Sequence, residues 1–342
     1  VNNYTFYNLD IEEGLIGGAS YDKFKLPITD QVLEKANNAD AVILGAVGGP
    51  KYDSLPFKLK PERGLLKLRK ELDLYANIRP AKAFNALKEA SSLKSEIIKG
   101  MDIIVLRELT GGIYFGEPRG IEDLDDGQRR GINTEVYTTN EIVRLAKVGF
   151  EIAMERKGLV HSVEKANVME SGILWREEVK KLHETKFSNI TLLNMYADNC
   201  AMQLVKNPSQ FDVIITGNLF GDILSDISAE LTGSLGMLPS ASLGDKINDR
   251  RKSLYEPVHG SAPDIAGKNI ANPIAMIMSF SMMLEHSFYD QTTSKVIEKS
   301  VENVLENGFR TKDICQDDTK EVSTSDMGEL ICEEFKSLSK NI

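Results

Sequence analysis

Two aspartates four residues apart carry the strongest chemical signal in the chain. Asp222 and Asp226 lie in segment 211–231, FDVIITGNLFGDILSDISAEL, where an apolar strand turns at Gly-Asn into a helix. Residues four apart share one helix face, and like charges there repel unless a cation lies between them. Because α/β proteins place their sites just past strand ends, the pair favours Mg²⁺ or Mn²⁺ binding. The alternative is a solvated acidic face.

Three arginines form a second candidate group. Arg107 ends the apolar run in VLREL, and Arg69 and Arg79 lie in LRKELDLYANIRP. Arginine packs poorly at a strand end but captures carboxylates through two parallel hydrogen bonds. For Arg69 alone, which has charged neighbours on a predicted helix, a surface salt bridge is the better interpretation. For Arg107 it is not.

Three further residues follow predicted strands or lie among glycines. Lys165 follows GLVHSVE, where desolvation can lower the pKa of a lysine and make it a base. Tyr114 offers a phenolic proton within GGIYFGEPRG. Asp198 follows a strand and precedes an asparagine, so it is equally typical of a turn or a cap. None of the three is diagnostic alone.

The segment HGSAPDIAGKNIANP, residues 259–273, is rich in small residues that let the backbone approach a ligand closely. It leads into a helix start suited to an anion. The G-x-G-x-x-G fingerprint occurs nowhere in the chain, so a Rossmann dinucleotide site is not expected. Asp264 could accept hydrogen bonds from two ribose hydroxyls and would repel a 2′-phosphate.

Short apolar runs alternate with amphipathic stretches, which is typical of an α/β fold. The predicted strands are Ala41–Leu44, Asp102–Leu106, Gly158–Val163, Ile190–Tyr196 and Phe211–Thr216.

Helices are predicted over Asn140–Arg156, with a capping box from Thr138 and Glu141, and from about Gly221 to Leu231. A third should follow an Asn272-Pro273 cap, and its methionines at 276, 278, 282 and 283 should be core. Segment 111–137 lacks helical periodicity and reads as an arm of short strands and turns.

Composition narrows the class of protein. The 342 residues carry a net charge of −10, which argues against nucleic-acid or anionic-membrane binding. Three widely spaced cysteines, Cys200, Cys315 and Cys332, indicate reduced thiols in a cytoplasmic protein. No membrane-spanning run or signal peptide is evident, and the chain begins at Val1 rather than Met.

Six segments in a fixed order resemble a known family along essentially the whole chain. They are GAVGGPKYD, PERGLLKLRKELDLYANIRPAK, RELTGGIYFGEPRG, KANVM, TGNLFGDILSDISAELTGSLGMLPSAS and EPVHGSAPDIAGKNIANP. Together they resemble the isocitrate/isopropylmalate dehydrogenase family of β-decarboxylating dehydrogenases.

The resemblance implies oxidative decarboxylation of 3-isopropylmalate to 4-methyl-2-oxopentanoate with NAD and Mg²⁺ or Mn²⁺, a step of leucine biosynthesis. In this assignment the three arginines bind the substrate carboxylates. Asp198 and Asp222 bind the metal, and Asp226 is either a third ligand or lies just behind the ligands. Lys165 takes the hydroxyl proton, and Tyr114 protonates the enolate.

The resemblance also assigns substrate and cofactor selectivity. Leu65 and Leu66 stand where isocitrate-using relatives carry polar residues, so they favour an isopropyl group. Asp264-Ile265 resembles NAD users rather than NADP users. The other cofactor contacts implied are Glu62, His259, Gly260, Ser261, Ala262, Pro263 and Asn272.

The implied fold has two α/β domains and is not a Rossmann fold. Residues 1–74 and 233–342 form the first, and residues 75–232, which include the arm, form the second. The implied assembly is a homodimer that shares its active sites, with Lys165 and Asp198 reaching in from the second subunit.

Relatives begin with a strand, a glycine-rich loop and a helix, whereas this sequence begins at about the following strand, Asn3–Leu9. We expect some twenty to thirty residues to precede it. Alternatives are a dehydrogenase for homoisocitrate, tartrate or methylmalate, a non-catalytic regulatory subunit, and a metal-binding interaction protein. Retention of all the acid–base and metal residues argues against the second, and the arginines argue against the third.

Overall fold

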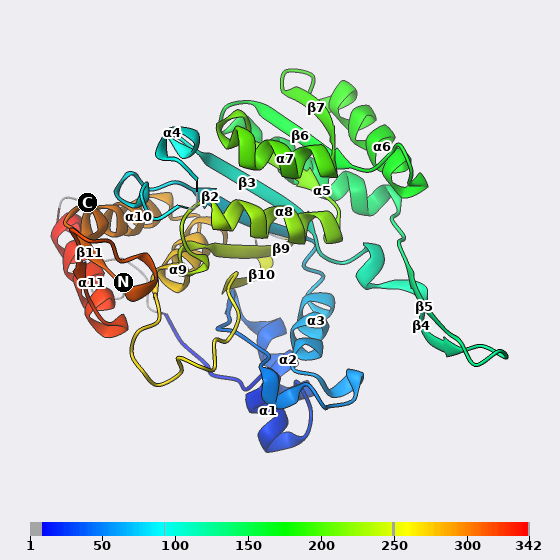
Figure 1. Cartoon of the computed structure of the whole chain (residues 1–342), viewed down its shortest axis with the longest axis horizontal. Coiled ribbons are helices and arrows are strands. Elements are labelled where there is room, and N and C mark those ends of the chain that lie inside the picture. The colour runs from blue at the N-terminus through cyan, green and yellow to red at the C-terminus, as the bar shows by residue number, and fades with distance from the viewer. Residues whose placement is uncertain (1–8, 92, 248–249, 341–342) are drawn as a thin grey trace. The chain divides into compact units, whose positions relative to one another are not determined.

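A computed structural model describes residues 9–91, 93–247 and 250–340 (Figure 1). The chain divides into two compact units. The first contains residues up to Leu74, Ala83–Ser95 and Ala229 onward, and the second contains Tyr75–Lys82 and Glu96–Ser228. Each unit is α/β, as the sequence predicts.

The second unit is built on five strands. In spatial order they are β2 (Ala76–Lys82), β3 (Asp102–Glu108), β8 (Val213–Thr216), β6 (Leu159–Glu164) and β7 (Thr191–Tyr196). Strands β3, β8, β6 and β7 run parallel, and β2 is antiparallel to β3. The carboxyl ends of the four parallel strands therefore lie along one edge.

Helices α5 (Thr139–Met154), α6 (Glu170–Lys186), α7 (Ala197–Lys206) and α8 (Asn218–Glu230) pack with these strands (Figure 1). The predicted capping box is present at α5: the Thr138 hydroxyl accepts from the Glu141 backbone N–H, and the Glu141 carboxylate accepts in return. A Cβ at Gly149 would lie 2.3 Å from the Ile215 side chain, so α5 approaches the sheet closely.

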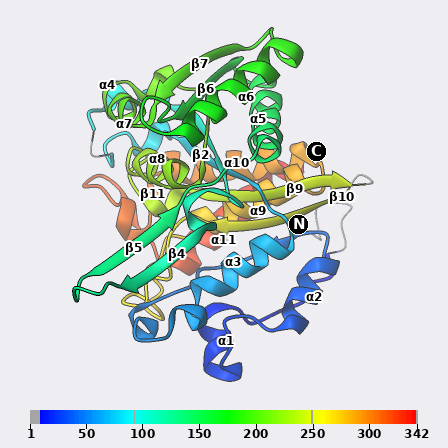
Figure 2. The same cartoon turned by 90° about the vertical axis from the view of Figure 1, so that its right-hand side faces the viewer.

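The arm predicted over residues 111–137 is a hairpin. Strands β4 (Gly116–Asp123) and β5 (Arg129–Thr134) pair antiparallel and extend away from the rest of their unit (Figure 2). Most of their residues are exposed, among them Ile121 at 69%. An exposed two-stranded ribbon is marginally stable by itself, so this geometry suits packing on another surface.

The first unit has two separate groups of paired strands. Strand β1 (Val42–Ile43) pairs parallel with β10 (Arg250–Pro257), which pairs antiparallel with β9 (Pro239–Ile247), and β11 (Phe309–Arg310) pairs parallel with β12 (Lys320–Glu321). Its helices are α1 (Gly17–Phe24), α2 (Asp30–Asn38), α3 (Glu62–Glu71), α9 (Ile274–His286), α10 (Gln291–Glu306) and α11 (Thr324–Ser339). Helix α4 (Ser95–Ile98) lies where the two units meet in the sequence.

Residues 83–95 belong to the first unit, whereas the sequence-based division places them in the second. The reason is apolar packing. Phe84 and Leu87 are buried in one cluster with residues of α9, α10 and α11, including Ile274, Val301 and Ile331.

The five strands predicted from sequence are all found, with ends shifted by up to two residues. All three predicted helix starts differ from the structure. The helix predicted over Asn140–Arg156 is α5, Thr139–Met154. Helix α8 begins at Asn218 rather than Gly221. Helix α9 begins at Ile274 with Pro273 as its cap residue, although the Asn272 side chain does accept from the Ile274 N–H. The strand predicted over residues 3–9 lies outside the described residues except for Leu9.

The methionine run of α9 is largely core, as predicted. Met282 and Met283 are buried, and Met278 packs against the cluster around Ile274. Among the described residues no helix is long and apolar enough to cross a membrane. All three cysteines are free thiols.

A buried histidine lies in the middle of β6. His161 is 2% exposed, and its Nδ1 has no hydrogen-bond partner within the described part of the chain. Its ring lies edge-on to Phe211 at a centroid distance of 4.6 Å. Burial lowers the pKa of His161 from 6.5 to about 4, and the nearby Asp212 charge opposes this shift. The folded protein therefore keeps this imidazole neutral where an unfolded chain would protonate it.

We expect this histidine to make the second unit acid-sensitive. As pH falls below 6.5, His161 binds a proton in the unfolded chain, but in the folded chain it stays neutral until pH is about 4. Between pH 7.5 and 5 this should cost about 2 kcal/mol of stability. The test is urea unfolding at both pH values, followed by fluorescence of Trp175, the single tryptophan, which lies in the same unit.

His161→Leu should reduce the loss on acidification by most of that amount. The control is His259→Leu, which removes a histidine from a loop of the first unit, outside the unit whose unfolding Trp175 reports. An equal loss of stability in parent and His161→Leu would contradict the assignment.

Candidate active site

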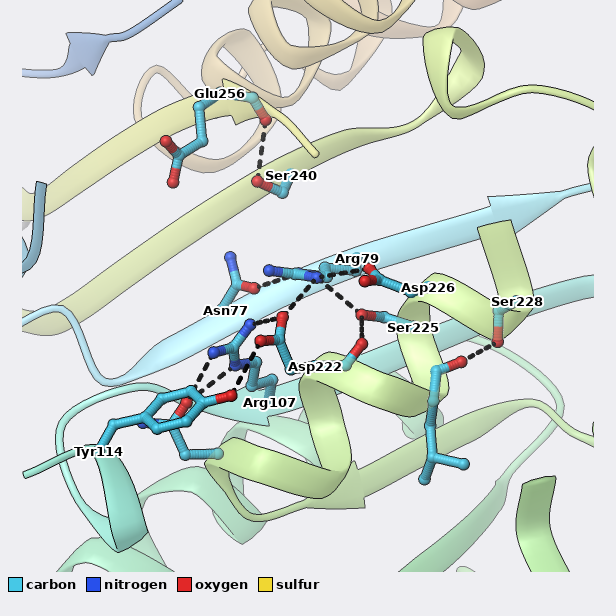
Figure 3. A network of polar contacts seen from close by, with 12 residues as sticks. Asn77, Arg79, Arg107, Tyr114, Asp222, Ser225, Asp226, Ser228, Ser240 and Glu256 are labelled. Carbon is cyan, nitrogen blue, oxygen red and sulfur yellow. Dashed lines mark hydrogen bonds and ion pairs between the residues drawn. The ribbon is translucent and has the colours of Figure 1, made fainter. Parts of the chain in front are cut away.

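One carboxylate, that of Asp222, gathers three side chains of the second unit (Figure 3). Its Oδ1 accepts from Arg107 Nη1 in a short ion pair and lies 3.4 Å from Arg79 Nη1. Its Oδ2 accepts from the Tyr114 hydroxyl at 3.2 Å. The side chains of Arg79 and Arg107 are only 11% and 5% exposed. The structure thus brings together four residues that the sequence singled out separately.

The same face of α8 continues with Ser225 and Asp226. Arg79 Nη1 donates to the Ser225 hydroxyl at 2.7 Å and lies 3.5 Å from Asp226 Oδ1, while Arg79 Nε donates to Asn77 Oδ1 at 2.7 Å. Desolvation raises the pKa of the Asp226 carboxyl, and the Asp222 charge raises it further against the opposing arginines. Asp226 is therefore a carboxylate that an added cation would stabilise.

Tyr114 ends a short 3-10 turn, Gly112–Tyr114. The Arg107 guanidinium lies 5.7 Å from the centre of its ring. Burial raises the pKa of the Tyr114 hydroxyl, and the Asp222 charge adds to this. The phenol therefore stays protonated at neutral pH and can act as an acid.

The local fold makes this cluster possible through a close approach of α8 to β3. A Cβ at Gly221 would lie 2.7 Å from both Cβ and Cγ of Arg107, so glycine alone fits at this position without a shift. Arg107 comes from β3 and Asp222 from the first turns of α8, which follows β8. Because β3 and β8 are adjacent and parallel, their ends deliver both groups to one place.

A second cluster forms at the ends of β6 and β7. Lys165 Nζ lies 2.8 Å from Asp198 Oδ1 and 5.6 Å from the centre of the Tyr196 ring. The hydrogen bond between Lys165 and Asp198 lowers the pKa of the Asp198 carboxyl. The preceding Glu164 is buried, pairs with Arg176 and accepts from the Ala166 N–H, which fixes the turn that carries Lys165.

The three aspartates assigned to the metal do not meet within one chain. Among the described residues no group of three or more His, Cys, Asp or Glu side chains is placed to hold a metal ion. Asp222 and Asp226 lie on α8, and Asp198 lies on α7 beside Lys165. One chain therefore offers two carboxylates at one position and a lysine–carboxylate pair at another.

Four predicted site residues lie on α3 in the first unit. Arg69 forms an ion pair with Glu256, and their side chains are only 11% and 7% exposed. The sequence favoured a surface salt bridge for Arg69; the pair exists but is nearly buried, and Leu68 of α3 shares an apolar cluster with Leu254 of β10. Leu65 packs against the apolar cluster around Leu68, and Leu66 is half-buried.

Glu62, at the start of α3, meets the loop at Gly48-Gly49. A Cβ at Gly48 would lie 2.5 Å from Glu62 Oε1, and Gly48 has a φ of +98° that favours glycine. The Ser261 hydroxyl donates to the Gly48 carbonyl at 3.1 Å. Three segments that are distant in sequence thus converge, and two of them carry predicted cofactor contacts.

The rest of segment 259–273 is mostly exposed, including Asp264 and the residues from Gly260 to Pro263, while His259 and Ile265 are half-buried. Asn272 is the exception. Its Nδ2 donates to Asp313 at 3.1 Å and its Oδ1 accepts from the Ile274 N–H at 3.0 Å. Both ends of this amide therefore have partners within the first unit.

These residues fit the ligands that the sequence suggests. Mg²⁺ usually binds through one or two carboxylates, with waters and substrate oxygens completing the octahedron, which suits Asp222 and Asp226. A small-residue loop beside Glu62 and a glycine pair suits close approach by a nucleotide. The glycines also leave room, since nothing lies within 4 Å of a Cβ at Gly260.

Sequence reasoning missed several residues that contact the predicted ones. They are Asn77, Ser225 and Asn218 around the arginines, Glu256 beside Arg69, and Glu164 and Arg176 beside Lys165. A buried-strand position with a charged residue was the available signal for Glu164 and Glu256. An asparagine or serine near a helix start carries no such signal, because it is equally typical of a cap.

Comparison with known proteins gives one consistent result. The isocitrate/isopropylmalate dehydrogenase family matches residues 1–331. A 3-isopropylmalate dehydrogenase of Pelagibacter ubique is 59% identical over 332 residues, covering 97% of this chain and 90% of the relative. The Rhodospirillum rubrum protein of the same name is 59% identical over 333 residues, covering 96% and 90%.

A solved structure agrees with the sequence relatives. The isocitrate dehydrogenase of Methylococcus capsulatus superimposes with a TM-score of 0.82 at 33% identity, covering 94% of this chain and 89% of that one. The chain belongs to the isocitrate/isopropylmalate dehydrogenase family.

Proposed function

We propose that the protein oxidises and decarboxylates 3-isopropylmalate with NAD and a divalent cation, as a step of leucine biosynthesis in the cytoplasm. The observation that carries the proposal is the cluster of Arg79, Arg107, Tyr114 and Asp222 in direct contact in the second unit. It joins anion-binding, acid and metal-binding groups. The names of the relatives at 59% identity support the choice of substrate.

The arginines bind the substrate carboxylates. Arg79 and Arg107 are nearly buried and held by fixed partners, so they present charge without first losing side-chain entropy. Arg69 would add a third cation, and Leu65 and Leu66 would contact the isopropyl group.

Two residues move protons at opposite stages of the reaction. Lys165 accepts the proton of the substrate hydroxyl, and Asp198, 2.8 Å from its Nζ, orients it and stabilises the charged product. Tyr114 donates its proton to the carbon left by carbon dioxide. Its raised pKa keeps that proton available until then.

Asp222 and Asp226, with Asp198, would hold the cation, which when bound acidifies the hydroxyl and stabilises the enolate charge. The charges of the second-unit cluster support this. Arg79 and Arg107 are balanced by Asp222 and Asp226, so a divalent cation and a dicarboxylate add without leaving net charge. NAD, held by Glu62 and segment 259–272, would accept the hydride, and Asp264 would exclude a 2′-phosphate.

An apolar surface supports the shared-site dimer. The side chains around Lys165 and Asp198 include large exposed hydrophobic residues on α6, β7, α7 and their flanking turns. They are Val168 at 67%, Ile173 at 45%, Leu193 at 47%, Met202 at 61% and Val205 at 45% exposed. Several large apolar side chains exposed on neighbouring elements favour a protein interface at this part of the second unit. A second copy seated there would bring its own arginine cluster to this Lys165–Asp198 pair.

One test of the proposed function concerns substrate and cofactor. NADH formation should be at least about tenfold faster, as kcat/KM, with 3-isopropylmalate than with isocitrate, a difference of about 1.4 kcal/mol. The test uses a panel that includes homoisocitrate, tartrate and methylmalate. NAD should work far better than NADP, and Asp264→Ala should relax that preference.

A homoisocitrate, tartrate or methylmalate preference would move the assignment to that acid. No turnover of any acid would favour the regulatory-subunit alternative. Equal use of NADP by the parent would show that Asp264 does not face the ribose.

Metal dependence is the second test of this site. Chelation should abolish turnover, and Mg²⁺ or Mn²⁺ should restore it. Asp226→Asn should weaken Mn²⁺ binding, measured by electron paramagnetic resonance, by about tenfold or more, because it removes one carboxylate without removing the Asp222 contacts to the arginines.

Ser228→Ala is the matched control, since Ser228 lies on the same helix and its hydroxyl donates only to the Leu224 carbonyl in the same turn. Its Mn²⁺ affinity should equal that of the parent. Full activity after exhaustive chelation would show that Asp222 and Asp226 pair with the arginines and bind no metal needed for catalysis.

Mixed dimers test whether the sites are shared. Tyr114→Phe and Lys165→Ala should each be nearly inactive, and refolding them together should restore activity. In a mixed dimer one site carries both lesions and the other carries neither, so random pairing restores about one quarter of parent activity.

The control mixture is Tyr114→Phe with Asp222→Asn. Both lesions then fall on the same side of each shared site, so every site keeps one and activity should stay low. Verified mixed dimers of the first pair without recovered activity would rule out shared sites.

A further inference from the structure

Arg107 is held by a neutral side chain as well as by Asp222. Asn218, the first residue of α8, is 1% exposed. Its Oδ1 accepts from Arg107 Nε at 2.9 Å and from Nη2 at 2.8 Å. The Asp222 carboxylate accepts from Nη1 of the same guanidinium. Asn218 and Asp222, one helical turn apart, thus accept from three nitrogens of the planar Arg107 guanidinium and restrict its rotation.

The other side of the Asn218 amide is tied to the tyrosine loop. Its Nδ2 donates to the Gly111 carbonyl at 3.0 Å, and its backbone N–H donates to the Tyr137 hydroxyl at 2.6 Å. Gly111 directly precedes the turn that carries Tyr114. One amide therefore connects the anion-binding arginine with the acid, whose hydroxyl reaches the same Asp222.

Packing around Tyr137 keeps the amide in place. The Tyr137 ring lies edge-on to Trp175 at 5.4 Å. A Cβ at Gly112 would lie 2.4 Å from the Tyr137 hydroxyl, and one at Gly217 would lie 2.9 Å from it. The hydrogen bonds also set the orientation of the amide, since its NH₂ faces a carbonyl and its oxygen faces a cation.

We propose that Asn218 is a positioning residue for the substrate, which fixes Arg107 and Tyr114 relative to Asp222 while leaving Arg107 its charge. This rests on the proposed role of Arg107 in binding a substrate carboxylate. The neutral amide matters because a second carboxylate on the guanidinium would compete with the substrate. A helix-capping asparagine would have no need of the Arg107 contacts.

A double-mutant cycle with Arg107→Lys separates positioning from capping. Asn218→Ala should raise the KM for 3-isopropylmalate by about tenfold or more, since it removes two hydrogen bonds to a charged group. Its KM for NAD should stay within about twofold of the parent. In the Arg107→Lys background the same substitution should cost less than about threefold, because lysine has no fork for Asn218 to hold.

Asn218→Asp provides a second readout. A carboxylate there still accepts from Arg107, but it faces the Gly111 carbonyl and neutralises the guanidinium. Its KM for the substrate should exceed that of Asn218→Ala at neutral pH and fall as pH is lowered, because the protonated acid restores a donor toward Gly111. Ser228→Ala, which removes another buried side chain-to-backbone bond on α8, should leave both KM values unchanged.

Equal losses of kcat/KM from Asn218→Ala in both backgrounds would overturn the proposal and leave Asn218 as a structural residue. So would an Asn218→Asp profile parallel to that of the parent. Failure of the proposed function is seen separately, in the parent enzyme against the acid panel. In that event, exchange of the Arg107 Nε proton is followed by NMR with nitrogen-labelled arginine. Faster exchange in Asn218→Ala supports the proposal that Asn218 positions Arg107, and unchanged exchange overturns it.

Discussion

The pairing of two nearly buried guanidinium groups with the Asp222 carboxylate is the interaction on which the second unit's site depends. Removing that carboxylate would leave Arg79 and Arg107 short of a counter-charge, which costs several kcal/mol in a buried position. Removing the arginines would leave Asp222 and Asp226 repelling one another on one helix face. The constraint extends to the backbone, since α8 must approach β3 so closely that position 221 holds glycine. The pairing of Asp222 with the arginines therefore depends on the close packing of α8 against β3.

Strand order explains why the candidate residues fall into two clusters. The parallel strands run β3, β8, β6, β7, and each delivers a polar group at its carboxyl end. Neighbours β3 and β8 supply Arg107 and, through the start of α8, Asn218 and Asp222. Neighbours β6 and β7 supply Lys165 and Asp198. The basic side chains of the two clusters also differ. Arginine stays charged and binds carboxylates through parallel hydrogen bonds from its guanidinium, whereas lysine can lose a proton and serve as a base.

Sequence patterns predict what depends on local order. The apolar runs of β3, β6, β7 and β8, the capping box of α5 and the Asp222–Asp226 spacing all follow from residues close in the chain. Strand β2 was not predicted, because Pro80 interrupts its pattern and proline is rare inside sheets. The Arg69–Glu256 pair joins residues 187 positions apart, and the Arg107–Asn218 contact joins residues 111 apart. No periodicity encodes such pairings; they arise only when strands from distant segments become neighbours. His161 was missed for a related reason, since one histidine in an apolar strand does not reveal that it lacks a partner.

The same strand order bears on whether one chain can complete a metal site. Asp198 follows β7, and β6 separates that strand from β8, which leads to Asp222. Among the described residues Asp198 joins no group of three or more His, Cys, Asp or Glu side chains placed to hold a metal ion. Asp198 is moreover engaged by Lys165 of its own chain. We propose that Asp198 and its lysine meet the other two aspartates only when they come from a second copy. The exposed apolar residues beside that pair provide a surface on which such a copy could dock. The engagement of Asp198 by Lys165 and the exposed apolar residues near them are the two observations on which the proposed shared-site arrangement rests.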